Sequence, residues 1–327
     1  MPVITLVNHK QFDAASNETV LDGALRANVV LEHSCKTGRC GTCKAEVVSG
    51  DTTAVIDEVA LTAAEKASGW ILTCARAPLN DIRLAVEDLG DEKLFPPRTF
   101  PCRIQSMERL APDVLRVFLR LPPQQNFEYR AGQYIDVMGP GSIRRSYSVA
   151  NAPAGQSAIE LHIRQVPGGT MSRYWFEDAK INDLLRLQGP LGTFFLRDLT
   201  TDQLIFLATG TGMAPIKALL ESLGRPAAMP APTVHVFWGG RTAQDLYWNP
   251  AQIGDWQYTP VLSRAGPSWI GARGYVQGAV LAKGIDLARA RVYACGSPAM
   301  IESARTVLVT NGLEPHHFHS DAFVCSG

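Results

Sequence analysis

Four cysteines stand at a spacing that few folds can accommodate. Cys35, Cys40 and Cys43 form the pattern C-x4-C-x2-C, and Cys74 follows thirty-one residues after the third cysteine. This spacing is typical of the four thiolate ligands of a 2Fe–2S cluster. Two glycines inside the loop suit a backbone that must fold tightly around such a cluster, because glycine adopts conformations closed to other residues. The spacing therefore predicts four metal ligands and a chain that carries single electrons.

A structural zinc site is the alternative interpretation of the same cysteines, and it would make the chain a zinc-stabilised binding module rather than an enzyme. Zinc sites usually combine two close C-x2-C or Cys/His pairs, whereas here one close trio is followed by a lone distant cysteine. Three further cysteines, Cys102, Cys295 and Cys325, complete an odd total of seven. An odd number with four metal ligands favours a reducing cytoplasm over a disulfide framework.

Composition excludes several classes of function. The 327 residues contain 46% hydrophobic and 19% charged residues, and Lys plus Arg equals Asp plus Glu at 31 each. A balanced charge without long single-sign runs speaks against a nucleic-acid or anionic-membrane surface. No stretch approaches the roughly 18 apolar residues of a membrane span, and the N-terminus lacks the pattern of a signal peptide. We therefore expect a cytoplasmic protein of two or three domains.

The first segment, residues 1–91, has the pattern of a small mixed sheet around one helix. Val3 to Val7, Lys44 to Ser49 and Ile82 to Val86 read as strands, and Thr19 to Ala27 has helical spacing. The charged and proline-rich stretch Asp91 to Pro101 cannot continue a regular element and predicts a semi-rigid linker, placed at residues 92–99.

The rest of the chain divides into two patterns. Residues 100–197 contain short β-type runs punctuated by Gly and Pro, with one helical stretch from Met171 to Asp178, which predicts an antiparallel barrel or sandwich. Residues 198–327 alternate buried-type strands with helices, which predicts a parallel α/β sheet. The antiparallel runs are Arg103 to Ser106, Val114 to Leu121, Gln133 to Met138, Arg145 to Ala150, Ile159 to Val166 and Asp183 to Gln188.

Residues suited to binding a flavin lie in the antiparallel segment. In Arg145-Ser146-Tyr147-Ser148, an arginine can pair with a pyrophosphate, a tyrosine can cover a flat ring and a serine hydroxyl can reach the redox-active nitrogen. A glycine turn then opens the helix, and free N–H groups at a helix start bind phosphate. The residues predicted there are Gly169, Thr170, Met171 and Ser172. His162 and Arg164 alternate on the preceding strand, where they either contact the cofactor or form a solvated face.

Two strand-to-helix turns in the α/β segment suit a nicotinamide dinucleotide. Thr209-Gly210-Thr211-Gly212 leads into a helix with Pro215 in its first turn, so that backbone can approach a pyrophosphate. Cys295-Gly296 repeats this logic at the last strand, where ligands bind at carboxyl ends. For Cys295 alone, a buried structural cysteine is the competing interpretation.

Taken in this order, the cysteine pattern, R-S-Y-S, G-T-G-x-A-P and C-G-S-P resemble the three-domain iron–sulfur flavoprotein reductases. The resemblance spans nearly the whole chain, and its flavin and nucleotide halves are similar to ferredoxin–NADP reductase. It is most specific for the CDP-6-deoxy-3,4-glucoseen reductases, which serve a deoxysugar dehydrase. The stretches that carry this likeness are Ala131 to Asp136, Arg144 to Pro153, Gly189 to Phe195 and Ser320 to Val324. Reductase components of aromatic-ring dioxygenases are similar too.

The resemblance implies a multidomain α+β and α/β fold: a β-grasp 2Fe–2S ferredoxin domain, a six-stranded antiparallel FAD barrel and a parallel-sheet NAD(P) domain. It also implies that Tyr147 packs on the isoalloxazine, that Ser148 lies near its N5 and that Phe323 shields the ring, with Asp321 close by. Three histidines at 316, 317 and 319 could suggest a metal site, but in this family their segment is a strand approaching the flavin.

The sequence gives opposing indications on the coenzyme. Ser263-Arg264 resembles the pair that holds the 2′-phosphate of NADPH in relatives, whereas the relatives most similar in wording use NADH. The second strand of the segment ends at Arg241, which we include among the nucleotide-binding residues, and no acidic residue stands there to bind an NAD ribose. We expect NADH, with NADPH possible, and a path of electrons from nicotinamide through FAD and the cluster to a partner: a deoxysugar dehydrase or, alternatively, an oxygenase component.

Overall fold

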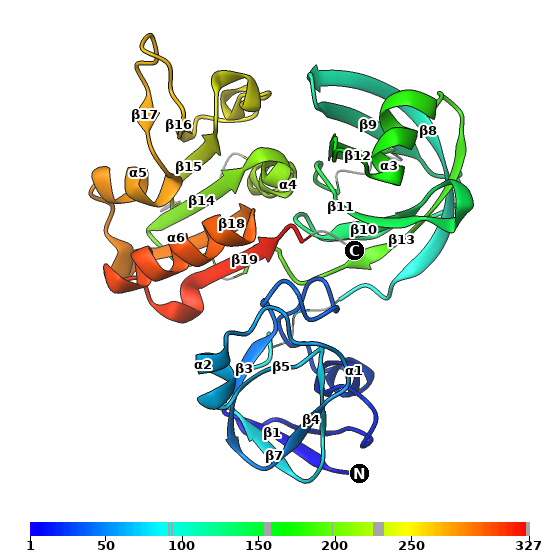
Figure 1. Ribbon diagram of the computed structural model, residues 1–327, viewed down its shortest axis with the longest axis vertical. Helices are drawn as coiled ribbons and strands as arrows, with labels where there is room; N and C mark the ends of the chain where they lie inside the picture. Colours follow the sequence, from blue (N-terminus) through cyan, green and yellow to red (C-terminus); the bar gives the residue numbers. More distant parts are fainter. Residues whose placement is uncertain (91, 93, 154–157, 198, 225–231, 325–327) are drawn as a thin grey trace. The chain divides into compact units, whose positions relative to one another are not determined.

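The computed structural model forms two compact units, Met1–Leu94 and Phe95–Gly327 (Figure 1). The structure describes residues 1–90, 92, 94–153, 158–197, 199–224 and 232–324. Cys325, whose role the sequence left open, lies outside the described residues.

The first unit contains a five-stranded mixed sheet in the order β2-β1-β7-β3-β5. Its helix α1 (Val20–Arg26) begins after Thr19, whose hydroxyl accepts a hydrogen bond from the Asp22 N–H and thereby caps the first turn. Val20 and Leu21 on the helix and Ile4 and Leu6 on β1 share one hydrophobic core, which confirms the expected sheet and helix. The elements of this unit besides α1 are β1 (Val3–Leu6), β2 (Gln11–Asp13), β3 (Lys44–Ser49), β4 (Thr52–Ala54), α2 (Ala63–Ala67), β5 (Trp70–Leu72), β6 (Arg76–Pro78) and β7 (Ile82–Leu84).

The second unit begins with a six-stranded antiparallel sheet in the order β11-β10-β13-β8-β9-β12. A bridge between Val149 and Leu161 joins the two outer strands, so the sheet closes as the predicted barrel. Tightly packed side chains such as Ile135 and Leu187 fill its interior. The elements are β8 (Arg98–Ala111), β9 (Val114–Arg120), β10 (Tyr134–Met138), β11 (Arg144–Ser148), β12 (Ala158–Arg164), α3 (Thr170–Arg173), a π-helical turn (Tyr174–Asp178) and β13 (Leu184–Leu191).

Strand β8 starts earlier than the sequence suggested. Arg98 and Thr99 were placed in the linker and the first strand was expected from Arg103, but Arg98 to Pro101 pair with β13, with Pro101 opposite Arg186. Pairing of β8 with β9 begins only at Arg103. At Pro101, β8 therefore pairs only with β13. Since no strand that the structure describes lies on its other side, the N–H that proline lacks is not needed for a hydrogen bond there.

The second half of this unit is a parallel sheet in the order β17-β16-β15-β14-β18-β19. Helices cover it, and α4 buries eight residues against β14 and its neighbours. The carboxyl ends of β14, β15 and β18 all reach one edge, where ligands of such sheets bind. The elements are β14 (Gln203–Thr209), α4 (Met213–Leu223), β15 (Thr233–Gly240), β16 (Gln257–Leu262), β17 (Ala272–Arg273), α5 (Val276–Ala282), β18 (Ala290–Gly296), α6 (Pro298–Thr310) and β19 (Phe318–Ala322).

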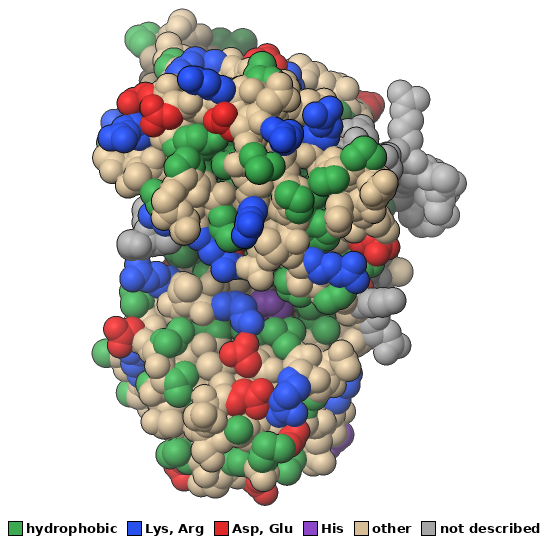
Figure 2. Space-filling model, turned by 90° about the vertical axis from the view of Figure 1, so that its right-hand side faces the viewer, with side chains coloured by type: hydrophobic (Ala, Val, Ile, Leu, Met, Phe, Trp, Pro, Cys, Tyr) green, Lys and Arg blue, Asp and Glu red, His purple; other side chains and the backbone are tan. Residues whose placement is uncertain are grey.

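The surface agrees with the balanced charge of the sequence. On the face shown in Figure 2, Lys and Arg lie interspersed with Asp and Glu and with hydrophobic side chains. Among the described residues, no helix combines the length and apolar character needed to cross a membrane.

Candidate functional site: cysteine loop and dinucleotide cavity

The four predicted cysteine ligands come together as two pairs of sulfurs. The Sγ atoms of Cys43 and Cys74 lie 3.3 Å apart. Cys35 and Cys40 share a side-chain hydrogen bond, which is the main cause that lowers the pKa of Cys35 to about 4. Backbone N–H groups of Thr37 and Arg39 also point at the Cys35 sulfur. The hydrogen bond to its partner sulfur raises the pKa of Cys40 and likewise that of Cys43, so what the loop itself supplies is N–H donors aimed at a ligand sulfur, as an iron–sulfur loop requires.

The pairing of the sulfurs fits a centre with two metal ions. Within the described residues, no group of three or more His, Cys, Asp or Glu side chains is arranged about a single ion. In a 2Fe–2S cluster each iron takes two protein ligands, so each of the two sulfur pairs would bind one iron. Gly38 makes the tight loop possible: its φ is +71°, and a Cβ there would lie 2.1 Å from the Asp57 carbonyl oxygen. The residues fit a 2Fe–2S cluster better than a mononuclear zinc ion.

Strand β11 positions the predicted flavin-binding residues on the barrel. The Ser146 hydroxyl donates to Asp136 on the neighbouring strand β10 at 2.5 Å, while Ser148 at the end of the strand is buried. Tyr147 is held by Trp175, whose indole N–H donates to its hydroxyl. Arg145 turns its guanidinium back onto the Arg144 carbonyl oxygen. A flat ring could therefore meet the face of Tyr147, whose position is fixed from within the barrel.

The glycine turn before α3 is formed as expected, but some of its residues have structural partners. Gly168 has a φ of +72°. The Ser172 hydroxyl accepts the Val166 N–H at 2.9 Å and so closes the turn. Met171 is 3% exposed and packs in the barrel core. Gly169 precedes the helix without a side-chain cap, but its N–H already donates to the Val166 carbonyl oxygen at 3.0 Å. The exposed Thr170 is therefore the residue of this turn best placed to meet a phosphate.

The two candidates on β12 differ in what they contact. His162 is buried, and its ring nitrogens lie 3.0 Å from Glu160 Oε1 and 3.1 Å from the Tyr247 hydroxyl. Since both nitrogens have protein partners, the geometry favours a structural role over contact with a flavin. Arg164 instead reaches the cavity described next.

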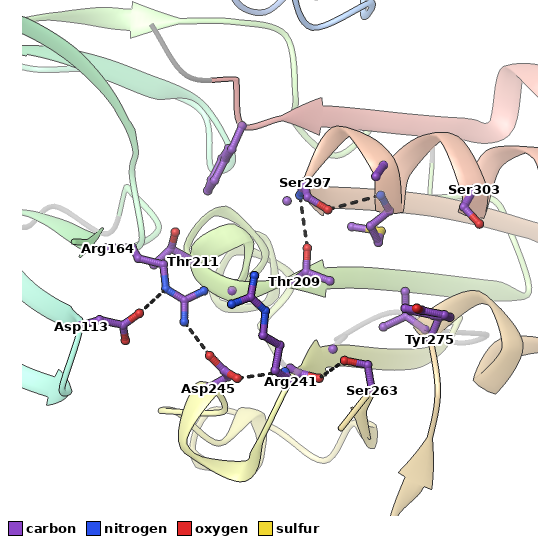
Figure 3. Close-up of a pocket in the computed structure, with 18 of the residues that line it drawn as sticks. Asp113, Arg164, Thr209, Thr211, Arg241, Asp245, Ser263, Tyr275, Ser297 and Ser303 are labelled. Carbon is purple, nitrogen blue, oxygen red and sulfur yellow. Dashed lines mark hydrogen bonds and ion pairs between the residues drawn. The ribbon is translucent and has the colours of Figure 1, made fainter. Parts of the chain in front are cut away.

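A cavity of about 900 Å³ lies between the barrel and the carboxyl edge of the parallel sheet. Figure 3 shows the Arg164 guanidinium between two carboxylates, Asp113 of the barrel and Asp245 of the parallel-sheet half, at 2.8 Å and 2.7 Å. On the sheet side, Gly210 and Thr211, which the sequence proposes for nucleotide binding, line the cavity. The volume is in the range of a small-molecule cofactor site.

Close backbone packing explains the glycine at 212. A Cβ on Gly212 would lie 2.2 Å from the Cys295 carbonyl oxygen, so only glycine lets the two strand-to-helix turns meet. Cys295 itself is fully buried and does not line the cavity, and burial raises the pKa of its thiol well above the ordinary value. Gly296 and Ser297 line the cavity in its place. Pro215 is buried within the first turn of α4.

The sequence missed residues that reach the cavity from loops. No acidic residue directly ends β15, but a short 3-10 turn returns Asp245 to the strand end, where it accepts the N–H groups of Arg241 and Thr242 at 2.9 Å. Thr209, the last residue of β14 and the first of the predicted turn, also lines the cavity, and its hydroxyl accepts the Ser297 N–H at 3.2 Å. An acidic residue five positions beyond a Gly-Gly strand end was the available signal for Asp245.

The residues proposed to select between NADH and NADPH differ in whether they line the cavity. Arg241 and Ser263 line the cavity, whereas Arg264 is absent from its described lining.

Phe323 also lines the cavity, and its N–H donates to the Gly296 carbonyl oxygen at 2.8 Å. Asp321 is buried on β19 opposite Cys295. Of the three histidines, His319 lies within β19 and the other two in the turn before it.

Three family models match successive parts of the chain. The 2Fe-2S iron-sulfur cluster binding domain matches residues 5–79, the oxidoreductase FAD-binding domain residues 101–196 and the oxidoreductase NAD-binding domain residues 206–306. Together they support the three cofactors that the sequence predicted.

Individual proteins are similar to this chain over nearly its whole length. The chain is 41% identical over 322 residues to the CDP-6-deoxy-L-threo-D-glycero-4-hexulose-3-dehydrase reductase of Yersinia pestis, covering 96% of each chain. It is 33% identical to terephthalate 1,2-dioxygenase reductase component 1 of a Comamonas species, covering 96% and 95%. Among solved structures, it resembles the Amycolatopsis cytochrome P450 reductase GcoB with a TM-score of 0.75 and 29% identity, covering 99% of each chain.

Proposed function

The chain belongs to the family of NAD(P)H-dependent iron–sulfur flavoprotein oxidoreductases, and we propose that it delivers electrons to a CDP-deoxysugar dehydrase. The 41% identity over 96% of both chains to a reductase named for such a dehydrase supports this acceptor. When bound, NAD(P)H supplies a hydride, FAD splits the electron pair, and a 2Fe–2S cluster passes single electrons onward.

The chain's own residues supply position rather than acid–base chemistry. We assign nucleotide binding to Gly210, Thr211 and Gly296 at the cavity, and flavin binding to β11 and the turn before α3. The Thr209 hydroxyl holds the Ser297 N–H and so fixes one turn of the cavity against the other. Phe323 at the cavity would exclude water from the reacting rings until the nicotinamide enters. We assign the cluster to Cys35, Cys40, Cys43 and Cys74, whose sulfurs form the two pairs described above.

We further assign three domains, at residues 1–91, 100–197 and 198–327, with a linker at 92–99. The compact first unit and the family-model matches at 5–79, 101–196 and 206–306 support this division. We place the protein in the reducing cytoplasm, since the six cysteines that the structure describes are all free.

Reconstitution with candidate acceptors tests the proposed partner. A CDP-deoxysugar 3-dehydrase is incubated with its CDP-hexulose substrate, NADH and this chain. We expect deoxygenated product only when all are present, with none from the Cys43→Ser variant. Product in equal yield without this chain would overturn the assignment.

A ring-hydroxylating oxygenase is the second candidate acceptor, supported by the 33% identity to a terephthalate dioxygenase reductase. The same assay with a purified oxygenase component separates the two. Hydroxylated arene at a rate above that of the dehydrase reaction would favour the oxygenase and leave the reductase activity itself intact.

A further inference from the structure

A buried charged network joins the barrel to helix α4, and none of it takes part in the function described above. Lys217 on α4 is 7% exposed and lies between two carboxylates, Glu160 and Glu221. It donates to Glu160 Oε2 on β12 at 2.7 Å, to Glu221 Oε1 one helical turn later at 2.6 Å, and to the Ala150 carbonyl oxygen at 3.0 Å. All three of its donors are therefore used, two of them by groups of the barrel.

The network continues through Glu160 to a second contact between the two halves. The Glu160 carboxylate accepts a hydrogen bond from Nε2 of His162. The other ring nitrogen of His162, Nδ1, faces the hydroxyl of Tyr247, a residue that follows β15 in the chain. A carboxylate can only accept, so the proton of the neutral imidazole lies on Nε2 and Tyr247 donates to Nδ1. Burial acts to raise the pKa of Glu160, but the His162 hydrogen bond and the Lys217 charge outweigh it and hold the pKa below its ordinary value.

The bonds of Lys217 and Glu221 connect the chain just after β11, the strand assigned to the flavin, with helix α4. Ala150 lies two residues after Ser148, at the end of the flavin strand, and Ala152 donates its N–H to Glu221 Oε2 at 2.9 Å. Lys217 lies one turn into the helix that begins at the Gly210–Gly212 turn of the cavity. The same two side chains thus hold the end of the flavin strand against the helix of the nucleotide turn.

We propose that Lys217 is a positioning residue that fixes the nucleotide-binding helix against the flavin strand, and thereby sets the approach of the nicotinamide to the flavin. The proposal rests on the proposed function. A buried charge pair is costly unless every member is satisfied, and here each has its partners, so the network specifies one arrangement of the two halves. Misplacement of reacting atoms by about 1 Å can cost about 100-fold in rate.

The test replaces Lys217 by methionine in the full chain loaded with its cofactors. We expect Lys217→Met to retain flavin and cluster but to slow flavin bleaching by NADH in anaerobic stopped flow by about 10- to 100-fold, with KM for NADH within about 3-fold. Lys283→Met, which removes an exposed lysine of the same half, is the matched control and should reduce at the parental rate. A parental rate in Lys217→Met would overturn the proposal.

Two further measurements separate positioning from simple loss of stability. Lys217→Met/Glu160→Gln removes the more deeply buried of the two carboxylates that lose their cation, and we expect it to regain part of the thermal stability while reduction stays slow, since the bond to Ala150 is still lost. Recovery of the rate together with stability would contradict positioning. Hydrogen exchange of the Ala152 amide should also quicken in Lys217→Met and in Glu221→Ala, with no nucleotide present. If Lys217→Met alone does not fold, Lys217→Met/Glu160→Gln decides: an unchanged reduction rate in that variant would refute the role.

Measurement of the unmutated protein distinguishes failure of the positioning role from failure of the proposed function. If NADH bleaches the parental flavin but Lys217→Met behaves like the parent, only the positioning role fails. If NADH does not bleach the parental flavin, the proposed function fails first.

Discussion

The indole N–H of Trp175 donates a 2.9 Å hydrogen bond to the Tyr147 hydroxyl, with the two rings nearly perpendicular at 85°. Trp175 is 2% exposed, so this bond satisfies the one polar atom that its side chain brings into the barrel core. Burial, opposed by this bond, raises the pKa of Tyr147 to about 12, so its hydroxyl stays protonated. The barrel therefore fixes the orientation of the ring that we assign to the flavin face.

Removing this bond should loosen the flavin site. We predict that Trp175→Phe weakens FAD binding by about 3- to 10-fold, as expected for about 1 kcal/mol of one hydrogen bond, measured by flavin fluorescence during titration. Tyr147→Phe removes the same bond from the other side. In a double-mutant cycle the two changes should therefore not add, and fully additive effects would show that the bond is irrelevant to FAD binding.

A cluster ligand should be separable from the flavin. We predict that Cys43→Ser loses the visible bands of the iron–sulfur cluster and cluster-dependent cytochrome c reduction, because it breaks the Cys43–Cys74 sulfur pair. Ferricyanide reduction by the flavin should remain within about 2-fold of the parent, since no step before the flavin is changed. Loss of both activities in a folded protein would mean that the order of electron carriers is wrong. Cys102→Ala is the control that removes a buried cysteine of the barrel.

Alkaline pH should destabilise the second unit through Cys102. Burial raises the pKa of this thiol from 9.0 to about 12. The unfolded chain thus releases the proton first, so the stabilising contribution is complete below pH 9 and is lost as pH rises toward 12. We predict that Cys102→Ala lessens the alkaline loss of unfolding free energy by up to about 1.4 kcal/mol per pH unit, measured by urea unfolding. Equal slopes in parent and variant would contradict the burial effect.

Coenzyme preference should depend on Arg241 rather than Arg264. Arg241 and Ser263 line the cavity, where a 2′-phosphate would meet them. We predict that Arg241→Ala lowers kcat/KM for NADPH by about 10-fold and for NADH by no more than about 3-fold, because a charge-assisted bond is made only to the phosphate. Arg264→Ala should change both values equally. A larger loss for NADPH in Arg264→Ala than in Arg241→Ala would reverse the assignment.

Local patterns predicted the fold and marked part of the candidate site, and the residues that they missed lie mostly in loops. Alternation located the strands of the barrel, and G-T-G before Ala-Pro marked the turn at Gly210, because these signals depend on neighbouring residues. The contacts of Asp245 and Asp113 with Arg164 could not be predicted this way, since a 3-10 turn and a hairpin bring these residues together from distant parts of the chain. The partners of His162 were hidden for a related reason: on a strand its polarity is typical of a binding face, whereas in the fold Glu160 and Tyr247 contact both of its ring nitrogens.

One measurement tests the central claim most directly: anaerobic titration with NADH, and separately with NADPH, followed by visible spectroscopy. In a sample shown to contain both centres, we predict bleaching of the flavin and cluster bands together, with NADH acting at the lower concentration. Bleaching of neither band would contradict the account, because the cavity at Gly210 and Arg164 would then not be a site of hydride donation.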